Sequence, residues 1–187
     1  MWRSLVLLVV ILAAPVRAEP VPYRLDAAAS RVGFTYSLEG ASAAGRIPIL
    51  DADLLIDMKR LARSRLDVRL DAARAQTNLV FATEALTGPG VLDTANHPII
   101  SFRSTAVRAT DWGALIDGEV TIRGVTRPMQ LEARLFREVG REAHDYDRLQ
   151  VRLTGSVDRH AFGASGFPGL VAPEIGIEIT AWIDRAG

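Results

Sequence analysis

Apolar and polar residues alternate along most of this 187-residue chain, and this period of two constrains its fold more than any other feature. Near the C-terminus an isoleucine or alanine occupies every second position from Ile175 to Ile183. The same alternation runs from Val32 to Leu38 and from Leu66 to Leu70. Successive side chains of a β-strand point to opposite faces, so each segment predicts a strand with one buried face. The chain therefore predicts an all-β domain.

Eight or nine antiparallel strands are expected, near residues 23–26, 31–38, 45–57, 65–73, 99–108, 115–122, 129–139, 148–157 and 174–184. The segment Gly118–Leu131 predicts two strands joined by a tight turn that contains Gly124. Pro128 has no N–H group to give to a strand ladder, so the second strand is expected to begin at or just after it.

One segment has a helical rather than an alternating pattern. Within residues 78–86, Leu79, Ala82 and Leu86 are spaced for one face of a helix, and Asn78 is a candidate N-cap. The run Gly88-Pro89-Gly90 should end the helix. We expect a short helix that covers one end of the sheet, and a loop or a single helical turn in the glycine-rich segment 159–173.

The first 18 residues predict a cleavable secretory signal peptide. Arg3 precedes an apolar run, and Val16-Arg17-Ala18 resembles a cleavage site. The run is shorter than the roughly 20 residues that cross a bilayer, and no later segment is more apolar over such a length. We expect an exported domain of residues 19–187 without an integral membrane span; an uncleaved N-terminal anchor is the alternative.

The composition of the expected mature domain disfavours several classes of function. Cleavage would remove two of the 22 basic residues and leave 20 against 22 acidic ones, so no basic surface for nucleic acid is indicated. The chain has no cysteine, which excludes disulfides and thiolate chemistry. Its three histidines, His97, His144 and His160, lack metal-ligand spacing, and Asp158 with Arg159 suggests a local ion pair. We therefore expect no catalytic residue, no metal and no cofactor.

Alternation alone does not decide which face of the sheet is buried. A sandwich, a soluble barrel and an outer-membrane barrel all produce it. The chain has 3 Trp, 3 Tyr and 6 Phe, too few for the aromatic girdles of a membrane barrel. Charged residues such as Arg65, Asp67 and Arg69 are better solvated outside than packed in a narrow lumen, so the apolar face is expected to point inward.

Six motifs, in order along the chain, are similar to those of the YceI-like family, and the resemblance covers residues 23 to about 183. They are Tyr23-Arg24-Leu25-Asp26 with Ser30–Phe34, Gly45 with residues 50–57, Gln76-Thr77-Asn78 with Val91-Leu92-Asp93, His97-Pro98 with residues 101–104, Gly118–Pro128, and Val157-Asp158-Arg159 with Phe162-Gly163.

The resemblance implies an eight-stranded antiparallel lipocalin-like barrel that is exported to the periplasm and encloses the tail of a polyisoprenoid or a quinone-like lipid. The sequence leaves both a monomer and a dimer open. The expected ligand-binding side chains fall into two groups. The lumen group is Phe34, Tyr36, Leu54, Ile56, Phe102, Val120, Ile122, Leu131, Leu153, Ile177 and Ile179, and the group at the mouth is Phe81, Leu86, Phe162 and Phe167. A solid-cored structural or stress-interaction barrel without a small ligand is the alternative.

The chain departs from the family pattern at the expected helix. Many relatives carry an Arg-Asp pair and a following histidine there, whereas this chain has Ala82, Thr83 and Ala85. A pyrophosphate needs cations or several N–H donors to offset its desolvation, and this helix offers none from its side chains. We therefore expect an apolar or weakly polar lipid head, such as a quinone ring.

Overall fold

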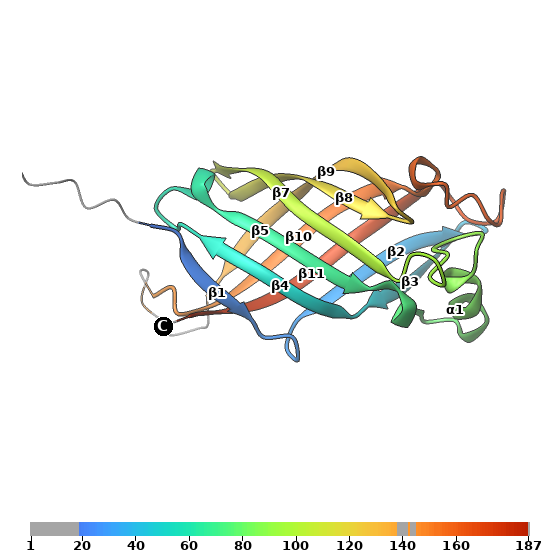
Figure 1. The fold of residues 1–187 in the computed structure, drawn as a ribbon, viewed down its shortest axis with the longest axis horizontal. Helices are drawn as coiled ribbons and strands as arrows, with labels where there is room; N and C mark the ends of the chain where they lie inside the picture. The colour runs from blue at the N-terminus through green and yellow to red at the C-terminus, as the bar shows by residue number, and fades with distance from the viewer. Residues whose placement is uncertain (1–18, 138–141, 143–144, 187) are drawn as a thin grey trace, which may run out of the picture.

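The structure is a computed structural model that describes residues 19–137, 142 and 145–186. The expected signal peptide and His144 lie outside the described residues. Figure 1 shows an elongated barrel of long, tilted strands, with the helix α1 at one end. The strands are β1 (Val21–Leu25), β2 (Arg31–Leu38), β3 (Ala41–Ile47), β4 (Ile49–Ile56), β5 (Arg65–Asp71), β6 (Gln76–Thr77), β7 (Ile99–Thr110), β8 (Gly113–Ile122), β9 (Val125–Phe136), β10 (Arg148–Asp158) and β11 (Glu174–Arg185).

The sheet closes into a barrel because β11 pairs with β1. Around the ring the order is β1, β4, β5, β7, β8, β9, β10 and β11, and every pairing is antiparallel. The strands β2, β3 and β6 continue the wall toward the end that carries α1, since β2 pairs with the first half of β11 and β3 pairs with β2 and β6. The fold is therefore an all-β, eight-stranded antiparallel closed barrel with one short helix, which confirms the predicted class.

Two prolines behave differently from the sequence-based expectation. The segment expected as one strand over residues 45–57 is divided at Pro48, whose carbonyl accepts from the Asp71 amide at 2.8 Å. Pro128 lies inside β9, opposite Glu119, so the expectation that this strand begins at or after Pro128 is wrong. Pairs in an antiparallel ladder alternate between bonded and non-bonded sites, and the position of Pro128 is non-bonded toward β8. Its missing N–H would face β10, and β10 pairs with β9 only from Glu132 onward.

The turn between β8 and β9 has the expected tight geometry. Ile122 pairs with Val125, so only Arg123 and Gly124 form the loop, with φ angles of 52° and 72°. Two positive φ angles in a two-residue hairpin match the right-handed twist of the strands, and glycine adopts this conformation without strain.

The helix α1 spans Val80–Thr87, close to the predicted range, and Gly88 ends it by donating to two carbonyls of the last turn. The predicted N-cap is wrong, because the position is held by Leu79 without a side-chain hydrogen bond. Asn78 instead bonds β3: its amide donates to the Ala44 carbonyl at 2.9 Å, and its side-chain oxygen accepts from the Ala44 amide at 3.3 Å. In the segment 159–173, residues Arg159–Phe162 form one 3-10 turn, which matches the predicted loop or helical turn.

Buried apolar side chains face the barrel interior, and one cluster of them joins β1 to the end of β11. Tyr23, Leu54, Ile56, Leu149 and Ile183 form this cluster, and Leu149 is fully buried. Charged side chains lie on the outer face, where ion pairs cross neighbouring strands, as between β4 and β5 and between β5 and β7. The predicted inward apolar face is therefore confirmed.

Candidate functional site

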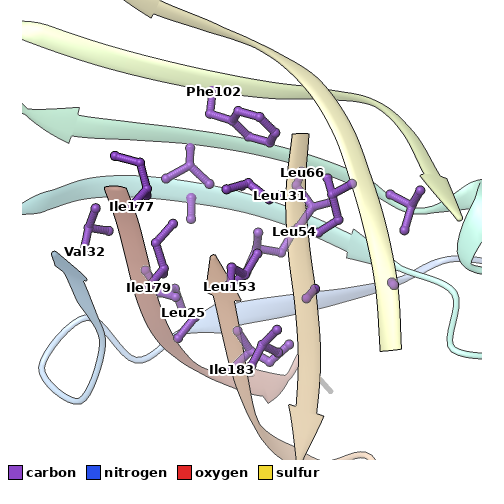
Figure 2. A pocket seen from close by; sticks show the side chains of 18 of the residues that line it. Leu25, Val32, Leu54, Leu66, Phe102, Leu131, Leu153, Ile177, Ile179 and Ile183 are labelled. Carbon is purple, nitrogen blue, oxygen red and sulfur yellow. The ribbon is translucent and has the colours of Figure 1, made fainter. Parts of the chain in front are cut away.

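The barrel encloses an apolar cavity of about 420 Å³. Every strand of the closed ring contributes side chains to it, and in Figure 2 Phe102, Leu131 and Ile177 point from three strands into the same space. Among the described residues that line it, only Ser64, Arg134, Arg137 and Tyr146 have polar side chains. We call this space the barrel cavity. Its size and lining resemble those of small-molecule pockets in general.

A second apolar cavity of about 330 Å³ lies at the end of the barrel that carries α1, and we call it the mouth cavity. Its walls come from α1, from the segment after α1, and from the loop that follows β10. The two cavities have six lining residues in common, Phe34, Ile47, Ile100, Ile122, Val157 and Ile177. These six side chains form the waist between the cavities.

All of the predicted ligand-binding side chains line one of the two cavities. The barrel cavity is lined by Phe34, Leu54, Ile56, Phe102, Val120, Ile122, Leu131, Leu153, Ile177 and Ile179. The mouth cavity is lined by Tyr36, Phe81, Leu86, Phe162 and Phe167, so Tyr36 belongs to the mouth and not to the lumen. Phe81 and Phe167 lie at the rim, 73% and 44% exposed. Their role in binding a ligand stays a prediction.

Other lining residues were not named by the sequence reasoning. Leu66, Val68 and Leu70 lie on a face that alternation already marks as apolar, and the same reasoning extended to every strand would have included them. Val91, Leu92, Leu170 and Val171 lie in irregular segments, where periodicity gives no signal.

Two inward-facing glycines enlarge the barrel cavity. A Cβ atom on Gly118 would collide with the Phe102 ring, and one on Gly45 would collide with the Phe34 ring. Each ring therefore lies along the wall over a glycine, where any other residue would push it toward the axis of the barrel. Because the two rings lie flat against the wall over the glycines, the space toward the axis of the barrel stays open beside Phe34 and Phe102.

Arg159 fastens the loop that forms one side of the mouth cavity. The residue is 6% exposed, and its guanidinium donates to the carbonyls of Gly166 at 2.8 Å, Val171 at 2.9 Å and Ala172 at 3.1 Å, and also to that of Ala164. Four of its five N–H groups are thereby used within the loop. The loop is consequently held by a side chain from its own first turn.

The predicted ion pair between Asp158 and Arg159 is wrong. The Asp158 carboxylate accepts from the His160 amide at 2.8 Å and caps the 3-10 turn, while the guanidinium points into the loop. Burial lowers the pKa of Arg159 from its ordinary value, and the Asp158 charge opposes this shift. The guanidinium still carries its proton, because the pKa of arginine starts far above neutrality.

The β8–β9 turn fastens the other side of the mouth. Arg123 donates to the carbonyls of Pro89, at 2.5 Å, and Val91, at 3.2 Å. The His97 ring lies against Gly124, where a Cβ atom would come within 3.0 Å of it. His97 therefore has a packing role in this structure.

Two other features, a metal site and a membrane-spanning helix, can be checked in the described residues. No three His, Cys, Asp or Glu side chains among them gather closely enough to hold a metal ion. Within the same residues, no helix has both the length and the apolar character needed to span a membrane.

Comparison with known proteins places the chain in a family. The model of the YceI-like domain matches residues 23–182. The chain belongs to the YceI-like family. The matched residues include all eight strands of the barrel ring, apart from the start of β1 before Tyr23 and the end of β11 after Trp182.

Individual relatives are more distant. The UPF0312 protein of Pseudomonas syringae pv. tomato is 28% identical over 131 residues, which cover 70% of this chain and 67% of that protein. Protein YceI of Escherichia coli O17:K52:H18 is 31% identical over 92 residues, which cover 49% of this chain and 48% of that protein. The aligned part of the chain therefore spans about half the length of this second relative.

Solved structures share the fold. BcnA of Burkholderia cenocepacia superposes with a TM-score of 0.74 at 17% identity, over 84% of this chain and 98% of that chain. A polyisoprenoid binding domain from Saccharophagus degradans, described as implicated in plant cell wall breakdown, has a TM-score of 0.63 at 12% identity, over 89% and 99% of the two chains.

Proposed function

We propose that this protein is an exported, periplasmic carrier or sequestering protein that holds the tail of a long-chain isoprenoid or isoprenoid-quinone-like lipid inside its barrel. The observation that carries the proposal is the apolar barrel cavity of about 420 Å³, which meets a second apolar cavity at the mouth. A solved relative with the same fold is named as a polyisoprenoid binding domain, which supports this ligand class.

The energetics of the barrel cavity favour an occupant. An empty apolar cavity costs about 24 cal/mol per Å³ by the measured effect of core truncations. The barrel cavity therefore leaves its apolar lining without packing partners when it is empty, at a cost in stability. A lipid tail would restore the missing contacts, whereas a solid-cored barrel would have filled this space with its own side chains. The alternative of a barrel without a small ligand is therefore the weaker one.

The binding energy of a tail can be bounded. Drug-sized ligands gain about 0.3 kcal/mol of binding free energy per non-hydrogen atom. A tail of 20 carbons would then contribute roughly 6 kcal/mol, a Kd in the range of tens of micromolar, and a longer tail would bind more tightly. The described residues that line the two cavities are almost all apolar, which suits a lipid tail, so we propose binding rather than catalysis.

Organic extraction followed by mass spectrometry tests the proposal. Protein purified from the periplasm of its native host should release a prenyl lipid in a stoichiometric amount. An extract without lipid, together with a wild-type protein that binds no added prenyl lipid, would refute the carrier role. Conversion of the bound lipid during incubation would instead indicate an enzyme.

A pair of variants shows whether the lipid occupies the barrel. Ile122→Arg places a charge at the waist, where both cavities meet, and burying an unpaired charge costs several kcal/mol. The matched control is Thr121→Arg, because Thr121 is the preceding residue and its hydroxyl pairs with Thr126 on the exposed face. We expect lipid to be lost from the first variant and kept by the second. Equal retention in both folded variants would place the lipid elsewhere.

A further inference from the structure

Exposed aromatic and arginine side chains gather at the end of the barrel opposite α1 (Figure 1). Trp112 lies in the turn between β7 and β8 and is 44% exposed, and Phe136, the last residue of β9, is 39% exposed. The Cζ atom of Arg134 is 5.7 Å from the centroid of the Trp112 ring, and that of Arg152 is 4.8 Å from the centroid of the Phe136 ring. We call these four residues the aromatic–arginine patch.

Two positive charges face each other in this patch. Arg134 of β9 and Arg152 of β10 are direct cross-strand partners, and like charges at such positions destabilise the sheet. Glu132 occupies the preceding outward position of β9, yet within the described residues neither guanidinium forms an ion pair. Elsewhere on the outer face, arginines of β5 and β7 do pair with a carboxylate of the neighbouring strand. An external anion would therefore relieve a repulsion that the protein leaves in place.

The patch borders on the barrel cavity. Leu135 lies between Arg134 and Phe136 on β9, and its side chain points to the opposite face of the strand. This leucine lines the barrel cavity and is 38% exposed, so the cavity comes to the surface beside the patch. A partner that binds the patch consequently lies next to the space proposed for the lipid tail.

We propose that the aromatic–arginine patch docks on the surface of a membrane that contains anionic phospholipids. Tryptophan is favoured at the level of the lipid head groups, and guanidinium groups bind their phosphates. The attraction is local, because the expected mature chain has 20 basic and 22 acidic residues and no net positive charge. The proposal goes beyond lipid binding, since it names the surface from which the protein would take its lipid or to which it would deliver it.

The mouth cavity has an exposed apolar rim of its own, formed by Phe81, Phe167 and Leu170. Among the described residues that line this cavity, Arg159 is the one cation, and its guanidinium is bound to carbonyls of the loop. The rim therefore offers no comparable attraction for phosphate groups. The charges favour the aromatic–arginine patch as the face that meets an anionic membrane.

Sedimentation with vesicles tests the docking surface. The exported protein, with its first 18 residues removed, is mixed with vesicles of phosphatidylcholine alone or with about one third phosphatidylglycerol. We expect binding to the mixed vesicles at low salt and its loss as the salt concentration rises. Because these vesicles contain no prenyl lipid, the result does not depend on the bound lipid.

Arginine substitutions measure the contribution of each charge. Arg134→Gln should lower the partition coefficient roughly fivefold, and the double variant with Arg152→Gln roughly thirtyfold, because each arginine near an anionic surface contributes a similar attraction. The matched control is Arg127→Gln, which removes an exposed arginine at the other end of the same strand. It should leave the partition coefficient unchanged.

A pair of aromatic substitutions compares the two ends of the barrel. Trp112→Ala should weaken vesicle binding roughly threefold to tenfold, since only the exposed part of the ring enters the head-group layer. Phe81→Ala, at the rim of the mouth cavity, should have no effect. All of these side chains are exposed, so the variants should unfold close to the wild type in urea.

Several results would overturn the docking surface. Equal binding to both kinds of vesicle, or binding that persists without the two arginines, would show that their charge is not used. Weaker binding in Phe81→Ala or Arg127→Gln, with none in Trp112→Ala, would move the membrane contact to the mouth. A dimer that Trp112→Ala converts to a monomer, without vesicle binding, would make the patch a contact between copies of the chain. A protein that retains prenyl lipid but binds no vesicle would refute the docking alone and leave the carrier function standing.

Discussion

Replacing Arg159 by alanine should open the loop at the mouth of the barrel. The substitution removes the donors of four loop carbonyls, in a residue that is 6% exposed. A hydrogen bond to a charged group contributes about 1.5–3 kcal/mol, so a simple sum would approach 10 kcal/mol. The loss is smaller than this sum, because the loop can open locally and bond its carbonyls to water. We expect the free energy of unfolding to fall by about 3–5 kcal/mol, because a buried carbonyl left without a donor costs about 1–3 kcal/mol and some of the four regain bonds to water.

Urea unfolding and hydrogen exchange together measure this effect. The loop amides of Ala164, Gly166 and Val171 donate to carbonyls in the structure, so they should be protected in the wild type and exchange faster in the variant. The matched control is Arg152→Ala, an exposed arginine of β10 whose guanidinium lies 4.8 Å from the centroid of the Phe136 ring. An exposed cation–π contact contributes about 0.5–1 kcal/mol, so this control should lose no more than that.

Two results would refute the reasoning about Arg159. A loss below about 1 kcal/mol with full protection of the loop would show that the four carbonyls do not depend on the guanidinium. A large loss with unchanged exchange in the loop would show that Arg159 stabilises the barrel as a whole. If the reasoning holds, the variant should also release bound lipid faster, because the loop supplies Phe167 and Val171 to the wall of the mouth cavity.

Three further predictions follow from the strands, the surface and the N-terminus. In Gly118→Ala the new Cβ atom would collide with the Phe102 ring and with the Arg103 carbonyl oxygen. The substitution should lower stability by about 1–3 kcal/mol in urea unfolding and reduce the lipid recovered by extraction; unchanged values would mean that both the ring and the backbone can move aside freely. The hydrogen bond from Arg148 holds the pKa of Asp26 below its usual value, so its stabilisation is present above the ordinary pKa and is lost as pH falls through the lowered one. Asp26→Asn should therefore lose less stability than the wild type between pH 5 and about pH 3, and an identical loss would contradict this role. Intact-mass measurement of exported protein should show cleavage after Ala18, whereas retention of the first 18 residues in a membrane fraction would support the uncleaved anchor.

The fold was predictable because its determinants repeat along the chain. Alternation with a period of two marks each strand independently, and the charged residues on the opposite face decide which side is wet. Leu66, Val68 and Leu70 therefore point inward, while Arg65 and Arg69 are exposed, as the pattern predicts. A wrong boundary for one strand does not change the prediction for the others. The barrel was therefore predicted correctly although the start of β9 was not.

The two wrong predictions about side-chain partners, the Asp158–Arg159 ion pair and the Asn78 N-cap, have one cause in common. Asp158 and Arg159 are adjacent and oppositely charged, yet the guanidinium bonds carbonyls of residues 164–172 because the loop folds back over it. Asn78 precedes a helix in sequence, yet its partner is Ala44, which the pairing of β3 with β6 brings alongside it. Both side chains bond backbone groups that the fold brings near, and a backbone group carries no residue-type signal in the sequence.

The corrected position of Arg159 changes the reason for expecting an uncharged head without changing the expectation. The sequence suggests an ion pair between Asp158 and Arg159, and such a pair would leave no net positive charge for an anionic head. In the structure its charge is instead compensated by four carbonyl dipoles, which leave it buried and turned away from an incoming anion. The surface that the described residues present to the mouth cavity is then almost wholly apolar. A site with apolar walls and no exposed charge distinguishes lipids mainly by the length of the tail, because each further buried carbon adds to the binding free energy, while a charged head would lose its hydration without compensation.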